Sequence, residues 1–223
     1  MASYRIGVLA SGGGSNLQAL MDRIRTGELP AELAFVISNN SRSGALDRAR
    51  AFGAPALHVS AVSEGGEAAA AARMLAIVKE RAIDLLVLAG YMKKVPETVL
   101  SHLKNRVVNI HPALLPAFGG SGFFGRAVHE AVVARGCQYS GMTVHMVDAH
   151  YDEGQILLQK AISLRQGGSA DEVAAAVLKL EHAWYWRVIR AFALGEIKPT
   201  ASDEPGRAVD AGDFPERMRR HGD

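Results

Sequence analysis

Short apolar runs alternate with amphipathic segments along the first half of the chain. After Ser15, the apolar residues Leu17, Leu20, Met21 and Ile24 recur with helical spacing and predict a first helix. The alternation continues, and it predicts strands over 4–10, 34–38, 56–59, 84–89 and 107–110 and further helices over 45–52 and 67–81. Strands that alternate with helices in this way indicate a parallel sheet covered by helices on both faces.

The pattern changes after Ile110. Residues 111–125 hold two prolines and four glycines, which predicts a functional loop in place of regular structure. Beyond the loop we predict a helix over 126–134 and an antiparallel pair of strands over 142–147 and 156–164. Ser169 and Glu172 then form a capping box that opens a long amphipathic helix running to Leu194.

The predicted fold class is therefore α/β. We expect an open, mostly parallel twisted sheet with helices on both faces, and an antiparallel addition in the C-terminal part. One domain is expected over 1–197, followed by a polar, extended tail over 198–223. In the long helix, Trp184, Tyr185 and Trp186 are expected to pack against other elements, because Trp184 lies at helical spacing from Leu180 and Val188.

Composition and charge exclude several classes of protein. The chain has 223 residues, of which 48% are hydrophobic and 22% charged, as in folded globular domains. A net charge of +2 offers no broad basic surface, so no nucleic-acid partner is expected. The longest uncharged apolar stretch, 85–92, is too short to span a membrane, and no secretion signal is visible. A single cysteine, Cys137, fits a reducing compartment, which predicts a cytoplasmic location.

Three consecutive glycines follow the first predicted strand. The segment Gly12–Asn16 has the chemistry of a phosphate site, because glycines allow close backbone approach and a helix N-terminus presents free N–H groups. It fits neither the dinucleotide fingerprint nor the P-loop, which favours a small phosphate ester. In the alternative interpretation, Ser15 only caps the helix and forms a capping box with Gln18.

A second candidate site lies at the end of the fifth predicted strand. Asn109 can donate a hydrogen bond to a developing oxyanion, and His111 can exchange a proton near neutral pH. An acidic loop with Asp148, Asp152 and Glu153 offers a carboxylate that could pair with His111 and raise its pKa. Alternatively, His111 only binds loop carbonyls.

A metal site is a further alternative at this place. It would be built from His145, Asp148 and His150. It is less favoured, because His145 lies in a predicted strand and no helical pair of histidines supports it.

Several of these segments together resemble a known family. They are Gly14–Ala19, Leu88–Met92, Asn109–Pro116, Gly141–His145 and Asp152–Gly154. The Asn-x-His-Pro and Leu-Leu-Pro motifs resemble the folate-dependent formyltransferases, and the Gly-Ser-Asn turn narrows the resemblance to the phosphoribosylglycinamide formyltransferases. It runs from about residue 5 to 195 and implies a Rossmann-like formyltransferase fold.

The resemblance implies transfer of a formyl group from 10-formyltetrahydrofolate to the amine of glycinamide ribonucleotide, in de novo purine synthesis and without a metal. Residues 1–105 would then bind the phosphate, and residues 106–197 would carry the catalytic and folate-binding residues. By the same resemblance, Asn109 would stabilise the tetrahedral oxyanion, His111 would polarise the formyl oxygen and donate a proton, and Asp152 would keep His111 protonated.

The resemblance also implies two sets of binding residues. The ribonucleotide would contact Gly13, Gly14, Ser15, Asn16, Leu17 and Glu181. The folate would contact Met92, Lys93, Lys94, Val95, Asn109, Asp148 and Asp152. The periphery departs from the family pattern at two positions. Leu178 stands where some members have a polar residue that contacts the phosphate. Glu67 stands near the position of an arginine that contacts the folate in some members, and Arg73 could make that contact instead.

Three other functions use similar residues. A formyltetrahydrofolate deformylase would use the same Asn, His and Asp with water in place of the amine, but it needs no phosphate site and is expected to carry an additional N-terminal domain. A formyltransferase acting on initiator tRNA is expected to show an additional C-terminal domain and a basic surface. A non-catalytic nucleotide-binding module is the third. The protein is expected to be a monomer or a homodimer.

Overall fold

A seven-stranded sheet forms the centre of the protein, whose computed structural model describes residues 3–200 and 209–210. The strand order is β3-β2-β1-β4-β5-β6-β7. Its strands are β1 (Tyr4–Leu9), β2 (Ala31–Ser38), β3 (Ala56–His58), β4 (Leu85–Leu88), β5 (Val107–His111), β6 (Tyr139–Met146) and β7 (Ile156–Ser163). The first five strands pair in parallel, whereas β6 and β7 are antiparallel, which confirms the predicted fold class.

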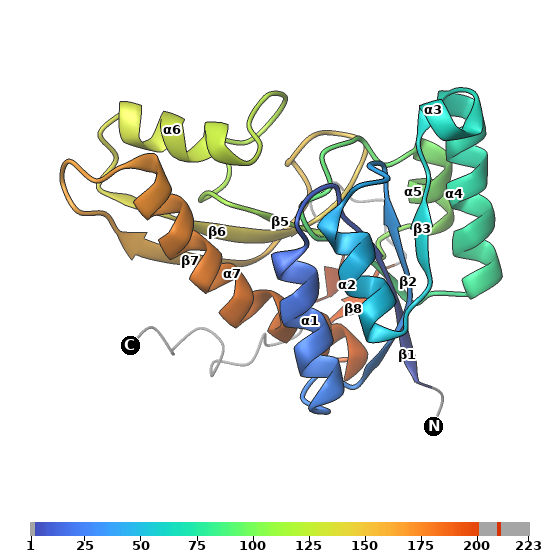
Figure 1. The fold of residues 1–223 in the computed structure, drawn as a ribbon. Coiled ribbons are helices and arrows are strands. Elements are labelled where there is room, and N and C mark those ends of the chain that lie inside the picture. Colours follow the sequence, from blue (N-terminus) through green and yellow to red (C-terminus); the bar gives the residue numbers. More distant parts are fainter. Residues whose placement is uncertain (1–2, 201–208, 211–223) are drawn as a thin grey trace.

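Helices cover both faces of this sheet (Figure 1). They are α1 (Ser15–Arg25), α2 (Gly44–Phe52), α3 (Ala61–Glu64), α4 (Glu67–Arg81), α5 (Glu97–His102), α6 (Arg126–Ala134) and α7 (Ala170–Ala193). Residues of α1, α2 and α7 share one buried cluster with one face of the sheet, and residues of α4 and α5 share a second cluster with the other. A central strand such as β4 is therefore buried throughout, and in the sequence it is a continuous run of apolar residues.

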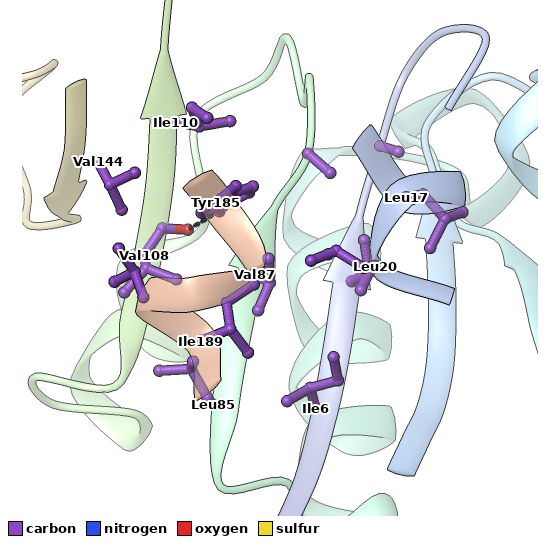
Figure 2. Packing of buried hydrophobic residues seen from close by; sticks show 14 of the residues in the cluster. Ile6, Leu17, Leu20, Leu85, Val87, Val108, Ile110, Val144, Tyr185 and Ile189 are labelled. Carbon is purple, nitrogen blue, oxygen red and sulfur yellow. Dashed lines mark hydrogen bonds between the residues drawn. The ribbon is translucent and has the colours of Figure 1, made fainter. Parts of the chain in front are cut away.

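The C-terminal helix α7 crosses the middle of the sheet. Tyr185 and Ile189 pack against Val87 and Val108, as Figure 2 shows. The buried Tyr185 hydroxyl lies 2.8 Å from the Leu88 carbonyl and 3.3 Å from that of Val108, so it joins β4 to β5. Packing was the role predicted for this aromatic run.

Most predicted elements are present, with differences at their ends. β2 begins at Ala31 and β6 at Tyr139, each three residues earlier than predicted. The short helices α3 and α5 were not predicted, because four and six residues are too few to show a helical period. The Ser169–Glu172 capping box is confirmed.

The interpretation of Ser15 as a helix cap is wrong. Gly14 occupies the N-cap position of α1 with a φ of 76°, and no side chain caps the helix. At the other end of the chain, β8 (Lys198–Pro199) pairs with β9 (Val209–Asp210); the rest of the predicted tail, 201–208 and 211–223, lies outside the described residues. None of the helices in the described ranges is long and apolar enough to cross a membrane.

The strand order changes direction between β1 and β4, and the segments that follow these strands lie side by side. The Ser11 N–H donates to the Gly90 carbonyl over 3.0 Å, and the Met92 N–H donates to the Ser11 hydroxyl over 2.8 Å. In open parallel sheets, ligands bind beyond the carboxyl ends of strands at such a switch point. The fold therefore brings the turn formed by Gly12, Gly13 and Gly14, the glycine turn, next to the segment that begins at Gly90.

Candidate active site

A cavity of about 580 Å³ opens at this edge of the sheet. Most of the predicted site residues line it, namely Gly13, Gly14, Ser15, Asn16, Met92, Lys93, Lys94, Val95, Asn109, His111, Asp148, Asp152 and Glu181. Leu17 does not line the cavity, because its side chain is wholly buried in the core; any contact from Leu17 must come from its backbone N–H. The fold thus brings segments far apart in sequence to one place.

Two strands supply the side chains at the middle of the cavity. Asn109 and His111 are two residues apart on β5, so they point to the same face of the sheet. On the neighbouring antiparallel strand β6, His145 is the register partner of Asn109, and its Nε2 lies 3.1 Å from the Asn109 Nδ2. The His145 Nδ1 donates to the Met146 carbonyl over 2.8 Å, because a carbonyl can only accept.

Asp152 joins the two histidines. Its Oδ2 lies 3.5 Å from the His111 Nδ1, and its Oδ1 lies 3.5 Å from the His145 Nε2. The same carboxylate accepts a hydrogen bond of 3.0 Å from the Gly120 N–H. Asp152 has a φ of 59°, a left-handed conformation that Asp and Asn adopt more readily than most residues. The expected pairing of Asp152 with His111 is present.

His145 is the residue of this centre to which the sequence assigned no catalytic role: it was considered only as a metal ligand in the less favoured alternative. A histidine in a strand is more often a satisfied structural residue, and its spacing from His111 carries no periodic signal. Its place becomes evident only with the β5–β6 register, which puts it opposite Asn109. His145 is buried and orients the Asn109 amide.

The charge of this centre follows from its burial. Burial alone raises the pKa of Asp152, but the neighbouring His145 and the charge of His111 outweigh it and hold the pKa below its ordinary value. For His111 the balance is reversed: burial lowers the pKa more than Asp152 raises it. Burial thus opposes the effect of Asp152 on His111, and the expectation that Asp152 keeps His111 protonated stays a prediction.

The other end of the cavity meets helix α7. Glu181 is buried there, where a solvated position would be ordinary for a helix glutamate, and it accepts a hydrogen bond of 2.7 Å from the Asn16 Nδ2. Burial raises the pKa of Glu181 to about 7. The Asn16 Oδ1 is buried without a hydrogen-bond partner. A ligand that reaches this end would therefore meet an acceptor that is unsatisfied.

The alternative metal site is not assembled. His145 is buried and engaged with Asn109 and Met146, whereas His150 is exposed and its Nδ1 lies 3.8 Å from Asp148. Within the described ranges, no group of three or more His, Cys, Asp or Glu side chains is arranged to hold a metal ion. At the periphery, Leu178 lines the cavity and Arg73 does not.

Comparison with known proteins agrees with this geometry. Residues 4–189 match the formyl transferase family. Phosphoribosylglycinamide formyltransferase of Bacillus subtilis is 33% identical over 83% of this chain and 93% of its own length. The crystal structure of glycinamide ribonucleotide transformylase 1 from Symbiobacterium toebii matches with a TM-score of 0.83 and 38% identity, over 89% of this chain and 92% of that one. The chain belongs to the phosphoribosylglycinamide formyltransferase family.

Other members and neighbours differ more in length. The chloroplastic phosphoribosylglycinamide formyltransferase of Vigna unguiculata is 35% identical over 84% of this chain, which spans 60% of that protein. A formyltetrahydrofolate deformylase from Pseudomonas syringae shares the fold with a TM-score of 0.80 and 25% identity, and the match covers 64% of that chain. Membership of the phosphoribosylglycinamide formyltransferase family thus rests on the higher identities and on the cavity residues together.

Proposed function

We propose that this protein transfers the formyl group of 10-formyltetrahydrofolate to the amine of glycinamide ribonucleotide, a step of de novo purine synthesis. The observation that carries the proposal is one cavity in which Asn109, His111 and Asp152 converge and which the glycine turn also lines. A formyl donor and a phosphorylated amine can occupy such a cavity together, which allows direct transfer without a covalent enzyme intermediate.

In this proposal the glycine turn binds the phosphate, and Asn16 and Glu181 contact the part of the ribonucleotide beside it. The N–H groups of Ser15, Asn16 and Leu17 lie in the first turn of α1, where they have no intrahelical acceptor. They can therefore donate to phosphate oxygens, and the helix dipole favours the negative charge. Residues 1–105 supply this phosphate site, and residues 106–197 supply most of the catalytic centre.

The folate is proposed to lie against Met92–Val95 and the loop that carries Asp148. Met92 is 53% exposed although it is a large apolar residue, so a flat aromatic ring that covers it would remove apolar surface from water. Lys93 and Lys94 line the same stretch and carry positive charge toward an anionic donor. No metal is needed for this reaction.

The proposed chemistry begins when the amine nitrogen attacks the formyl carbon. A C–N bond forms, the carbonyl oxygen becomes an oxyanion, and the Asn109 amide and His111 donate hydrogen bonds to it. The developing negative charge raises the pKa of His111 and so favours the imidazolium as the hydrogen-bond donor to the oxyanion. The attacking amine loses a proton toward Asp152, and the departing folate nitrogen receives one as the C–N bond to the donor breaks.

The test is absorbance-monitored loss of the formyl group from 10-formyltetrahydrofolate, with and without glycinamide ribonucleotide. Turnover that requires the ribonucleotide is the expected result. Turnover at the same rate without it would identify a deformylase, the candidate that the Pseudomonas syringae neighbour supports. Absence of turnover under both conditions would favour a non-catalytic nucleotide-binding module.

A double variant, Ser15→Ala with Asn16→Ala, tests which end of the cavity binds the phosphate. It is expected to raise the KM for the ribonucleotide at least tenfold, roughly the effect of losing more than one hydrogen bond to a charged group. The KM for the folate is expected to stay within about twofold, because these side chains are not among the residues proposed to contact the folate. If the folate KM changed instead, the phosphate site would be misassigned.

The remaining expectations are proposals of the same kind. The single cysteine supports a cytoplasmic location, and the near-neutral net charge of +2 supports the absence of a nucleic-acid partner. A monomer or homodimer stays a prediction.

A further inference from the structure

Helix α2 lies directly against the glycine turn and forms hydrogen bonds with the backbone carbonyls of Gly12 and Gly13. The Gly12 carbonyl accepts hydrogen bonds from the Ser43 hydroxyl over 2.8 Å and from the Ala45 N–H over 3.1 Å. The Gly13 carbonyl accepts one of 2.8 Å from the Arg48 Nε. A neighbouring helix thus fixes the orientation of two successive carbonyls in a turn made of three glycines.

Packing against α2 restricts only one of the three glycines of the turn. Gly14 has a φ of 76°, and a Cβ atom at this position would lie 2.8 Å from the Ala45 Cα. Gly12 and Gly13, by contrast, have open space where a side chain would be, so packing does not restrict them. Glycines without such restriction sample many backbone conformations. Hydrogen bonds to their carbonyls are therefore what determines the orientation of these peptide groups.

The orientation matters because a peptide group points its C=O and N–H in opposite directions. Carbonyls held toward α2 leave the intervening N–H groups free to face the cavity, which the turn lines. In the described part of the chain, the N–H groups of Gly13 and Gly14 donate to no backbone or side-chain acceptor. A turn with this orientation binds an anion; a turn whose carbonyls rotated into the cavity would repel it.

We infer that Arg48 is a positioning residue for the phosphate of the ribonucleotide: through its bond to the Gly13 carbonyl it holds the turn in the conformation that binds the anion. The inference rests on the proposed function. Arg48 is exposed and on the surface of α2, and its Nη1 also donates to the Gln18 Oε1 over 2.9 Å, which ties α1 to the same contact. An exposed side chain of this kind is dispensable for the core, so its loss leaves the fold intact.

The variants follow from the position of the donating atom. Arg48→Met removes the donor and keeps the length of the chain to that atom. Arg48→Gln places an amide nitrogen the same number of bonds from Cα as the arginine Nε, so it can restore the bond to Gly13 without restoring the charge. Arg50→Met is the matched control, since Arg50 lies on the same helix, is 57% exposed and pairs only with Asp47 among the contacts described for it.

The expected result is a rise of roughly five- to tenfold in the ribonucleotide KM for Arg48→Met, with kcat and the folate KM unchanged. Arg48→Gln is expected to recover most of the loss, and Arg50→Met to match the unsubstituted protein. If Arg48→Gln is as impaired as Arg48→Met, the charge of Arg48 acts on the phosphate directly and the positioning role is refuted. An unchanged KM in Arg48→Met refutes it as well.

Inorganic phosphate gives a readout that does not depend on the reaction. Phosphate bound at the turn raises the Tm of the folded protein, and at a fixed concentration the rise is larger the tighter the phosphate binds. The shift at a fixed phosphate concentration is expected to be smaller for Arg48→Met than for Arg48→Gln and Arg50→Met. Equal shifts in all variants overturn the inference. If phosphate shifts follow the expected order but the unsubstituted protein does not formylate the ribonucleotide, the proposed function fails while the positioning role stands.

Discussion

Replacement of Asp152 by asparagine removes one charge from the catalytic centre and little else. Asn has the same shape, adopts the left-handed conformation that Asp152 has at φ 59°, and keeps an oxygen that can accept from the Gly120 N–H. What it loses is the attraction between a carboxylate and the imidazolium that forms at His111 during the reaction. The substitution therefore isolates an electrostatic contribution to the transition state.

The size of this contribution can be estimated from the geometry. Two opposite charges at the 3.5 Å that separates the His111 Nδ1 from the Asp152 Oδ2 attract by about 5 kcal/mol at an effective dielectric constant of about 20, and by about 1 kcal/mol in bulk water. The Asp152 side chain is 13% exposed, which places the pair nearer the first limit. Since about 1.4 kcal/mol corresponds to a tenfold change, we expect kcat to fall by a factor on the order of 10² to 10³.

The assay is the pH dependence of formyl transfer at saturating concentrations of both substrates. Because Asp152 raises the pKa of His111 against the effect of burial, its neutralisation lowers that pKa further, and the alkaline limb of kcat is expected to move to lower pH. Glu153→Gln is the control, since Glu153 is exposed in the same loop. A fall in kcat of less than about fivefold, with no movement of the alkaline limb, would refute the pairing of Asp152 with His111.

Two further predictions concern stability. Tyr185→Phe removes the hydroxyl that joins the Leu88 and Val108 carbonyls. Chemical denaturation is therefore expected to show that the free energy of unfolding falls by about 1–3 kcal/mol, with both KM values unchanged. A fall of less than about 0.5 kcal/mol would contradict this prediction. Burial raises the pKa of Glu181 to about 7 in the folded protein, from an ordinary value of 4.5, so the folded state binds more protons than the unfolded state between these two pH values. The free energy of unfolding should therefore fall by about 2 to 3 kcal/mol from pH 5 to pH 8 through this group. Glu181→Gln should lack that loss, and parallel stability curves for the two proteins would argue against a buried neutral Glu181.

The elements that the sequence predicted correctly are those whose periodicity persists. β4 is buried throughout and appears as an uninterrupted apolar run, β5 begins with buried apolar residues, and α7 combines a capping box with a long apolar stripe. The elements that were missed or shortened lack such a signal. β2 begins with the partly exposed segment Ala31–Leu33, where an acidic residue interrupts the apolar run. The alternative in which Ser15 caps α1 is wrong although a serine often supplies a cap, because only backbone geometry shows that Gly14 takes this position.

Residues of the site were predictable where a motif or an unusual run marked them. The glycine turn, the Asn109–His111 pair and the acidic loop each carry recognisable chemistry. His145 and Arg48 do not, because their roles depend on contacts with residues 36 and 35 positions away, respectively. The direction of the His111 pKa cannot be derived from the sequence for a related reason: the sequence shows the neighbouring acid, but the burial that lowers the pKa is a property of the fold.

The position of Asp152 is itself a consequence of the antiparallel part of the sheet. β6 runs opposite to β5, so its last residue, Met146, lies beside Val108, and the chain must turn back over the sheet to bring Asp152 to His111. That return passes so close to the Met146 carbonyl that a Cβ atom at Gly154 would overlap it. In a wholly parallel sheet, the loop after the next strand would start at the same edge as His111 and would need no such return. Asp152, the proposed catalytic residue, is thus positioned by a strand reversal and by the absence of a side chain at Gly154.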